Sequence, residues 1–247
     1  MIDREFEHII GMGGHCQTAF QIRRYFDLDR AYPFDWWVTP TVGLVELLET
    51  GFEDIFREDY IKIVQESTGP AVTCSRYHLM HYHDFDEAKI NDAFSPYLVR
   101  QLCARNNSKF AYLVTRLLNL SGDVLFIRHA NGWTEFDDRV CQFDPSLIQR
   151  FQVAINKLLP KVNVTLLILN DFNSEHGLDG QYADWVYTSV VDAHGETGWS
   201  GSDKGWDDLF NHHKIRLRKP VAIEASTAEP LVAANTHGVA QVALKTA

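Results

Sequence analysis

An amphipathic helix between two apolar runs, in the middle of the chain, constrains the fold more than any other feature of the sequence. Residues 123–128 and 162–170 are almost continuously apolar, as expected of strands that are buried on both faces of a sheet. Between them, residues 146–159 place apolar side chains at helical spacing and end before Pro160. A strand-helix-strand unit of this kind builds parallel sheets, so we expect a parallel sheet covered by helices.

Length and composition favour one folded domain. The chain has 247 residues, which a single α/β domain can span, and 45% of them are apolar, enough to bury a sizeable core. We therefore predict a single α/β domain over residues 1–224, with three α/β/α layers around a largely parallel or mixed sheet. Residues 225–247 are rich in Ala, Thr and Val without a helical or strand period, which predicts a weakly structured tail.

The remaining pattern predicts further helices and strands. Residues 6–10 favour a first strand, followed by a glycine-rich loop and a helix from Cys16. Residues 106–108, Asn-Asn-Ser, interrupt the apolar spacing of residues 96–120, which predicts two helices or one broken helix. The other expected elements are a helix and turn at 41–56, strands at 60–64, 72–82 and 183–191, a short helix at 205–212 and an edge strand at 214–219.

Charge, cysteine usage and hydropathy argue against several classes of protein. A net charge of −10 disfavours nucleic acid as a partner, since nucleic-acid-binding proteins normally display a basic surface. The first residues lack the layout of a secretory signal, and no apolar run is long enough to cross a membrane. The four cysteines form no CxxC pair, which is typical of free thiols in a reducing compartment. We expect a cytoplasmic protein that acts on a small molecule or a peptide, without a nucleic-acid or membrane partner.

Cys16 is the candidate nucleophile because it follows a glycine-rich loop at the expected start of the first helix. A helix N-terminus favours the thiolate by lowering the thiol pKa, and glycines let the backbone approach a substrate closely. The N–H groups of Gly14, His15 and Cys16 can then hold an oxyanion, as acyl transfer requires. Two other interpretations stay open: Cys16 as a small buried hydrophobic residue, and the glycines as a phosphate cradle, although their spacing is not GxGxxG.

Residues 77–87 form a second candidate cluster, with three histidines and three carboxylates in eleven residues. If this segment is a strand, His83 can reach a nucleophile on a neighbouring element and act as a general base, with His81 as the next choice. Alternatively, the histidines and Asp84 or Asp86 form a zinc site, although their spacing matches no strong zinc signature. In a third interpretation these side chains are only half-exposed and hydrogen-bonded. We predict no metal and no other cofactor.

The segment 32–39, Tyr-Pro-Phe-Asp-Trp-Trp-Val-Thr, is a compact group of aromatic residues. Pro33 disfavours a helix here, so we expect an ordered loop. Phe34 and Trp36 are predicted to be structural and buried against the first helix, because large aromatic side chains contribute much of a buried core. Asp35 is then the polar member of the segment that faces the site.

Three motifs together resemble a known bacterial family: Gly-Met-Gly-Gly-His-Cys-Gln-Thr-Ala at 11–19, Tyr-Pro-Phe-Asp-Trp at 32–36 and His-Asp-Phe at 83–85. The family is catalogued as papain-like cysteine peptidases and is itself a domain of unknown function. The resemblance implies a nucleophile at Cys16, a histidine at His83, and Asp84 or Asp35 as the carboxylate that orients the imidazole. It also offers a second fold, papain-like α+β, in which a helix pairs with an antiparallel sheet.

Two functions therefore stand side by side. The first is a cysteine-dependent hydrolase or acyl transferase, in which Cys16 attacks an amide or ester and His83 carries the proton. The second is a non-catalytic or nucleotide-sugar-binding α/β module, possibly similar to glycosyltransferases, in which the glycine loop, Trp36 and Trp37 line a ligand pocket. A buried, unreactive Cys16 would favour the second function.

Overall fold

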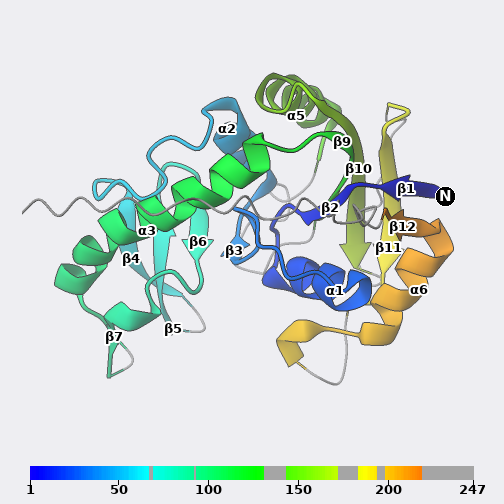
Figure 1. The fold of residues 1–247 in the computed structure, drawn as a ribbon. Coiled ribbons are helices and arrows are strands. Elements are labelled where there is room, and N and C mark those ends of the chain that lie inside the picture. Colours follow the sequence, from blue (N-terminus) through cyan, green and yellow to red (C-terminus); the bar gives the residue numbers. More distant parts are fainter. Residues whose placement is uncertain (67–68, 92, 131–142, 172–182, 194–197, 219–247) are drawn as a thin grey trace, which may run out of the picture.

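The computed structural model describes residues 1–66, 69–91, 93–130, 143–171, 183–193 and 198–218. The predicted tail at 225–247 and Cys141 lie outside these residues. Helices and strands are mixed, and a parallel sheet with helices on both faces forms the larger part of the described structure (Figure 1). The chain is an α/β protein, as the sequence predicts.

The main sheet has four parallel strands in the order β11-β10-β9-β2. Their bounds are β2 (His8–Gly11), β9 (Gly122–His129), β10 (Val162–Asp171) and β11 (Val186–Val191). The two apolar runs of the sequence are β9 and β10, which occupy the inner positions. A further parallel pair joins β1 (Arg4–Phe6), which only Glu7 separates from β2, to β12 (Ile215–Leu217).

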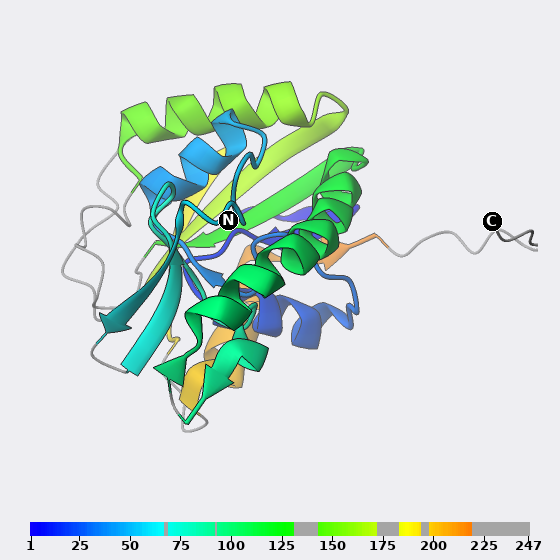
Figure 2. The same cartoon turned by 90° about the vertical axis from the view of Figure 1, so that its left-hand side faces the viewer.

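Side chains of the inner strands point alternately into two hydrophobic clusters, one on each face of the sheet. Val124 and Phe126 belong to one cluster, and Leu125 and Ile127 belong to the other. The helices α2 (Thr41–Glu49) and α5 (Pro145–Leu158) cover the first face, and α1 (Cys16–Phe26) and α6 (Asp203–His213) cover the second (Figure 2). This arrangement confirms the three predicted layers.

The antiparallel strands form a separate sheet beside the parallel one (Figure 1). Its order is β3-β6-β5-β4, with bounds β3 (Trp37–Val38), β4 (Ile61–Glu66), β5 (Gly69–Cys74) and β6 (Leu79–His81). The smaller elements nearby are η1 (Asp86–Ala88), β7 (Lys89–Ile90) and β8 (Ala93–Phe94). The first helix follows a parallel strand, so the layered fold describes the region around Cys16 and the papain-like α+β alternative does not.

One sequence prediction is wrong in this part of the molecule. The residues 96–120 form a single helix, α3 (Pro96–Leu118), without a break at 106–108. Asn106 is buried, and its Nδ2 donates a hydrogen bond of 2.7 Å to the carbonyl oxygen of Asp84. The polar side chain that suggested a break is therefore satisfied by another segment, and the helix continues through it.

Within the described part of the chain, no helix combines the length and apolar character needed to cross a membrane.

Candidate functional site

The loop between β2 and α1 packs tightly against the carboxyl end of β9. Gly13 and Gly14 have φ angles of +71° and +83°, a backbone conformation that favours glycine. A Cβ atom on Gly14 would lie 2.4 Å from the carbonyl oxygen of His129. These glycines therefore fit a close contact with the neighbouring strand, which argues against the interpretation of the loop as an open phosphate cradle.

Arg128 also holds this loop in place, through a hydrogen bond to its backbone. This side chain on β9 is fully buried, and its Nη1 donates a hydrogen bond of 2.8 Å to the carbonyl oxygen of Met12. Its Nη2 donates to the carbonyl oxygen of Thr39, in the segment between β3 and α2. A single guanidinium thus links the glycine loop to the aromatic segment 32–39, because its fork of donors reaches both.

A cavity of about 520 Å³ opens next to the start of α1. Its lining residues are Cys16, Trp36, Tyr82, His83, Asp84, Lys109 and Trp199. Three of the four predicted catalytic residues, Cys16, His83 and Asp84, line this one cavity although they come from segments far apart in the sequence. The fourth, Asp35, is not among the lining residues.

Cys16 is the first residue of α1 and is half-buried. Burial raises the pKa of its thiol, and the backbone N–H groups of Cys16 and Gln17 only partly oppose this effect. The sequence predicted a lowered thiol pKa, which is the wrong direction because desolvation outweighs the helix N-terminus. His15, the other predicted oxyanion residue besides Gly14, precedes the helix with its ring centroid 5.1 Å from that of His129.

His83 lies on the exposed side of the cavity. Its Nδ1 is 3.2 Å from Oδ2 of Asp86, and 48% of its side chain is exposed. Its ring meets the ring of Trp36 edge to face, with 5.8 Å between the centroids. The carboxylate that contacts the His83 imidazole is therefore that of Asp86, whereas the resemblance had implied Asp84 or Asp35.

Asp84 contacts a different histidine. Its Oδ2 is 3.0 Å from Nδ1 of His81 and accepts a hydrogen bond of 2.8 Å from Nε1 of Trp37. Burial alone would raise the pKa of Asp84, but the hydrogen bond and charge of His81, together with the Trp37 bond, hold it below its usual value. His81 itself is buried against Phe56 and Phe85, and its Nε2 has no hydrogen-bond partner among the described residues.

Asp35 has a structural environment. It is buried, it pairs with Arg23 of α1, and it accepts a hydrogen bond of 2.9 Å from the backbone N–H of Tyr32. Burial raises the pKa of Asp35 to about 6 against these favourable contacts. Phe34 is buried as predicted, but Trp36 is only half-buried and lines the cavity, so its predicted burial is wrong. The fully packed tryptophan of this segment is Trp37.

The histidine cluster does not converge as a zinc site would. His78 is exposed in a turn, His81 is buried among aromatic rings, and His83 faces the cavity. In the described ranges, no group of three or more His, Cys, Asp or Glu side chains is placed to hold a metal ion.

Three lining residues were missed by the sequence reasoning: Tyr82, Lys109 and Trp199. Tyr82 lies between two residues that the motif did identify, so its position was available from the sequence. Trp199 lies in η2 (Gly198–Ser200), and its carbonyl oxygen accepts a hydrogen bond of 3.2 Å from Nε2 of Gln17. That contact joins the two ends of the described chain, and no local pattern indicates it.

A comparison with known protein families finds a match over the N-terminal half of the chain. Residues 7–132 match the model of a family described as "Putative papain-like cysteine peptidase (DUF1796)". The chain belongs to this family. The match covers the glycine loop, the aromatic segment, the histidine cluster and Arg128, and it includes every lining residue of the larger cavity except Trp199. No curated protein and no solved structure matches the chain.

Proposed function

We propose that the chain is a cysteine-dependent hydrolase or acyl transferase, with Cys16 as the nucleophile and His83 as the group that accepts its proton. The observation that carries the proposal is the cavity that Cys16 and His83 line together. Membership of a family described as cysteine peptidases supports the same chemistry.

The raised pKa of Cys16 makes a base necessary. The thiol stays protonated near neutral pH, so it must lose its proton before or during attack on a carbonyl carbon. Histidine is the side chain whose ordinary pKa suits this transfer. The contacts of the His83 ring with Asp86 and Trp36 support a fixed orientation for the imidazole.

The reaction then follows the order of acyl transfer. The Cys16 thiol gives its proton to His83, and the sulfur bonds to the carbonyl carbon of the substrate. Backbone N–H groups at the start of α1 stabilise the resulting oxyanion. The carbonyl re-forms as the bond to the leaving amine or alcohol breaks, and His83 returns the proton to that group. Water or a second nucleophile finally cleaves the thioester and restores the thiol.

An activated ester tests the proposal without knowledge of the natural substrate. We expect 4-nitrophenyl acetate to acetylate Cys16 near neutral pH, as followed by nitrophenolate release and by mass spectrometry of the Cys16 peptide. His83→Gln should slow acetylation by about a hundredfold or more, the usual range for loss of a general base.

His78→Asn is the matched control, because His78 belongs to the same histidine cluster but is exposed outside the cavity lining. Its acetylation rate should equal that of the wild type. Equal rates for His83→Gln and His78→Asn, or no acetylation of Cys16 at all, would contradict the proposal.

A further inference from the structure

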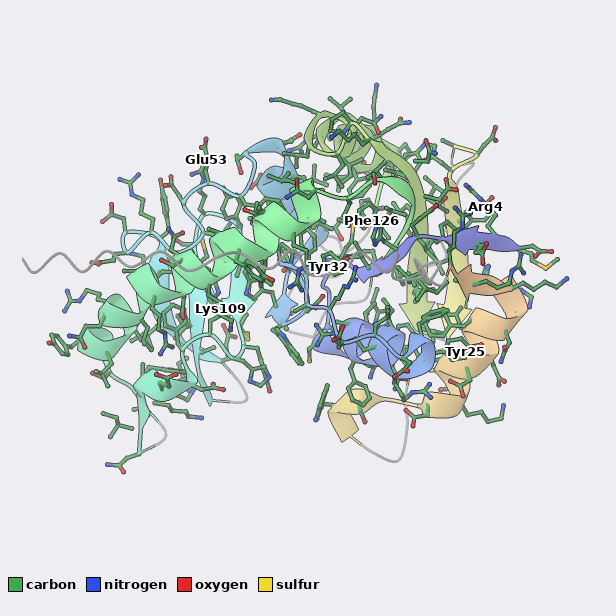
Figure 3. All side chains as sticks on the ribbon, in the orientation of Figure 1. Arg4, Tyr25, Tyr32, Glu53, Lys109 and Phe126 are labelled. Carbon is green, nitrogen blue, oxygen red and sulfur yellow. The ribbon has the colours of Figure 1, made fainter. Side chains whose placement is uncertain are left out.

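A second, smaller cavity adjoins the one that holds Cys16. The two cavities share three lining residues, Trp36, Asp84 and Lys109, so they meet at this common wall. The smaller cavity lies between α3, which carries Lys109, and the segment 32–37, which begins at Tyr32; both residues are labelled in Figure 3.

Most of the residues that line the smaller cavity are apolar or aromatic. They include Pro33, Trp37, Phe56, Phe110 and Leu113. Two of its polar groups are already engaged, since Trp37 Nε1 donates to Asp84 and Asn106 Nδ2 donates to the Asp84 carbonyl oxygen. A group that enters it therefore gains free energy from leaving water and needs no hydrogen bond of its own.

Volume limits the size of that group. The smaller cavity measures about 80 Å³, whereas an apolar cavity of about 150 Å³ is large enough to hold benzene. A branched aliphatic group of three or four carbons fits, and a phenyl ring does not. The larger cavity, at about 520 Å³, has room for the rest of a substrate.

We propose that the smaller cavity is a specificity subsite, which takes a branched aliphatic side chain of the substrate while its carbonyl group lies at Cys16. This inference deepens the proposed function and rests on it. Lys109 lines both cavities, and its positive charge helps to lower the pKa of Asp84, which also lines both. The chemical class that the site selects is therefore an acyl compound or peptide with a valine-like or leucine-like group near the reacting carbonyl.

Alkylation of Cys16 by a series of iodoacetamides tests the subsite. The reagents are iodoacetamide, N-isobutyl-iodoacetamide and N-benzyl-iodoacetamide, used in alkaline buffer, where hydroxide in place of a protein base removes the thiol proton. Rates at Cys16 are measured by mass spectrometry and divided by the rates with glutathione. The isobutyl reagent should react about tenfold faster than iodoacetamide, since its alkyl group is buried as the bond forms.

Substitutions at Leu113, which is half-buried on α3, decide whether the smaller cavity causes this preference. Leu113→Trp fills the cavity and should abolish the isobutyl advantage, measured as the ratio of the isobutyl rate to the iodoacetamide rate of the same variant. Leu113→Ala enlarges it and should extend the advantage to the benzyl reagent. Leu118→Trp is the matched control, because Leu118 is exposed on the same helix and lines neither cavity.

The outcomes separate the two proposals. An isobutyl advantage that Leu113→Trp leaves intact, or no advantage in the wild type, overturns the subsite. Failure of every reagent to reach Cys16 also overturns it, since the cavity would then be closed. Loss of His83 dependence in the acetylation experiment overturns the proposed function but leaves the alkylation ratios unaffected.

Discussion

Gly14 carries two constraints at once, and they can be measured separately. Its φ angle of +83° disfavours any residue with a Cβ atom, and the carbonyl oxygen of His129 occupies the place where that atom would be. Gly51, which follows α2, has a comparable φ of +64°, but the nearest atom to its added Cβ is a side-chain carbon of Leu158 at 3.9 Å. Gly51 thus has the backbone constraint without the steric one.

We predict that Gly51→Ala lowers the free energy of unfolding by about 1 kcal/mol, the cost of a left-handed conformation. Gly14→Ala should lower it by about 3 kcal/mol or more, because the loop must also move away from β9. Denaturant unfolding of both variants measures the difference. A Gly14→Ala protein as stable as Gly51→Ala would show that the loop has room to shift.

The candidate nucleophile and base could be found from the sequence because they lie in short, unusual motifs. Cys16 follows glycines that have no other local explanation, and His83 lies in a dense cluster of titratable residues. Lys109 could not be found, since it is one charged residue among several on a long helix. Its position at the cavity depends on how α3 packs, and helical periodicity does not supply that information.

At the scale of elements, a hydrogen bond from one side chain of α3 holds the segment that carries the candidate base. Asn106 is buried in the helix, and its hydrogen bond to the Asp84 carbonyl oxygen holds the segment that carries both Asp84 and His83. The adjacent Asn107 is exposed. The sequence therefore offers two neighbouring asparagines in the same helix, only one of which contacts the histidine segment.

We predict that Asn106→Ala lowers the free energy of unfolding by about 1 to 3 kcal/mol, since it leaves the Asp84 carbonyl oxygen without its donor. Asn107→Ala should change stability by less than about 0.5 kcal/mol, as is usual at exposed positions. Thermal and urea unfolding give both values. If the two variants were equally stable, the hydrogen bond would contribute nothing to holding the segment.

Sequence periodicity gave the right type for α3 but the wrong continuity. The apolar spacing of residues 96–120 predicts a helix, and Asn-Asn-Ser predicts an interruption because these residues favour turns. Whether such residues break a helix depends on what their side chains bond to. The side chain of Asn106 bonds to Asp84, in another segment, so the helix continues. The parallel strands β9 and β10 are easier to predict from the sequence, because burial on both faces of the sheet gives each of them a continuous apolar run.

At the scale of the whole molecule, two buried titratable groups, Asp35 and His213, have opposite effects on how stability changes with pH in acid. Burial raises the pKa of Asp35 from 3.8 to about 6, so the stability it contributes at low pH is lost as the pH rises through this window. Burial lowers the pKa of His213 from 6.5 to about 4, so its contribution is lost as the pH falls through nearly the same window. Each shift of about two units corresponds to about 3 kcal/mol.

We predict that these two effects largely offset each other between about pH 4 and 6. Asp35→Asn should make stability rise with pH across that range, and His213→Leu should make it fall. His213→Leu removes no hydrogen bond, because neither ring nitrogen has a partner among the described residues. His212→Leu, at an exposed neighbouring position, is the control. Unfolding measured at several pH values would contradict the prediction if the variants kept the wild-type slope.

The layered architecture followed from the sequence, whereas the separate antiparallel sheet did not. Its strands are short and partly exposed, and the β-forming residues of 72–82 predict short strands there without indicating where β5 ends and β6 begins. Individual strands were recognisable there, but their assembly depends on pairings between distant residues, such as Trp37 with His81. Propensity does not determine such pairings.

Because Gln17 and Trp199 lie far apart in the sequence, the contact between them can form only late in translation. The ribosome releases Cys16 and His83 early, and Trp199, which completes the cavity, emerges last of the lining residues. At synthesis rates of about 5 to 20 residues per second, the interval between Cys16 and Trp199 is on the order of 10 to 40 s. A growing chain therefore carries its thiol for that time without the wall that η2 supplies, and the complete cavity can form only after Trp199 has left the ribosome.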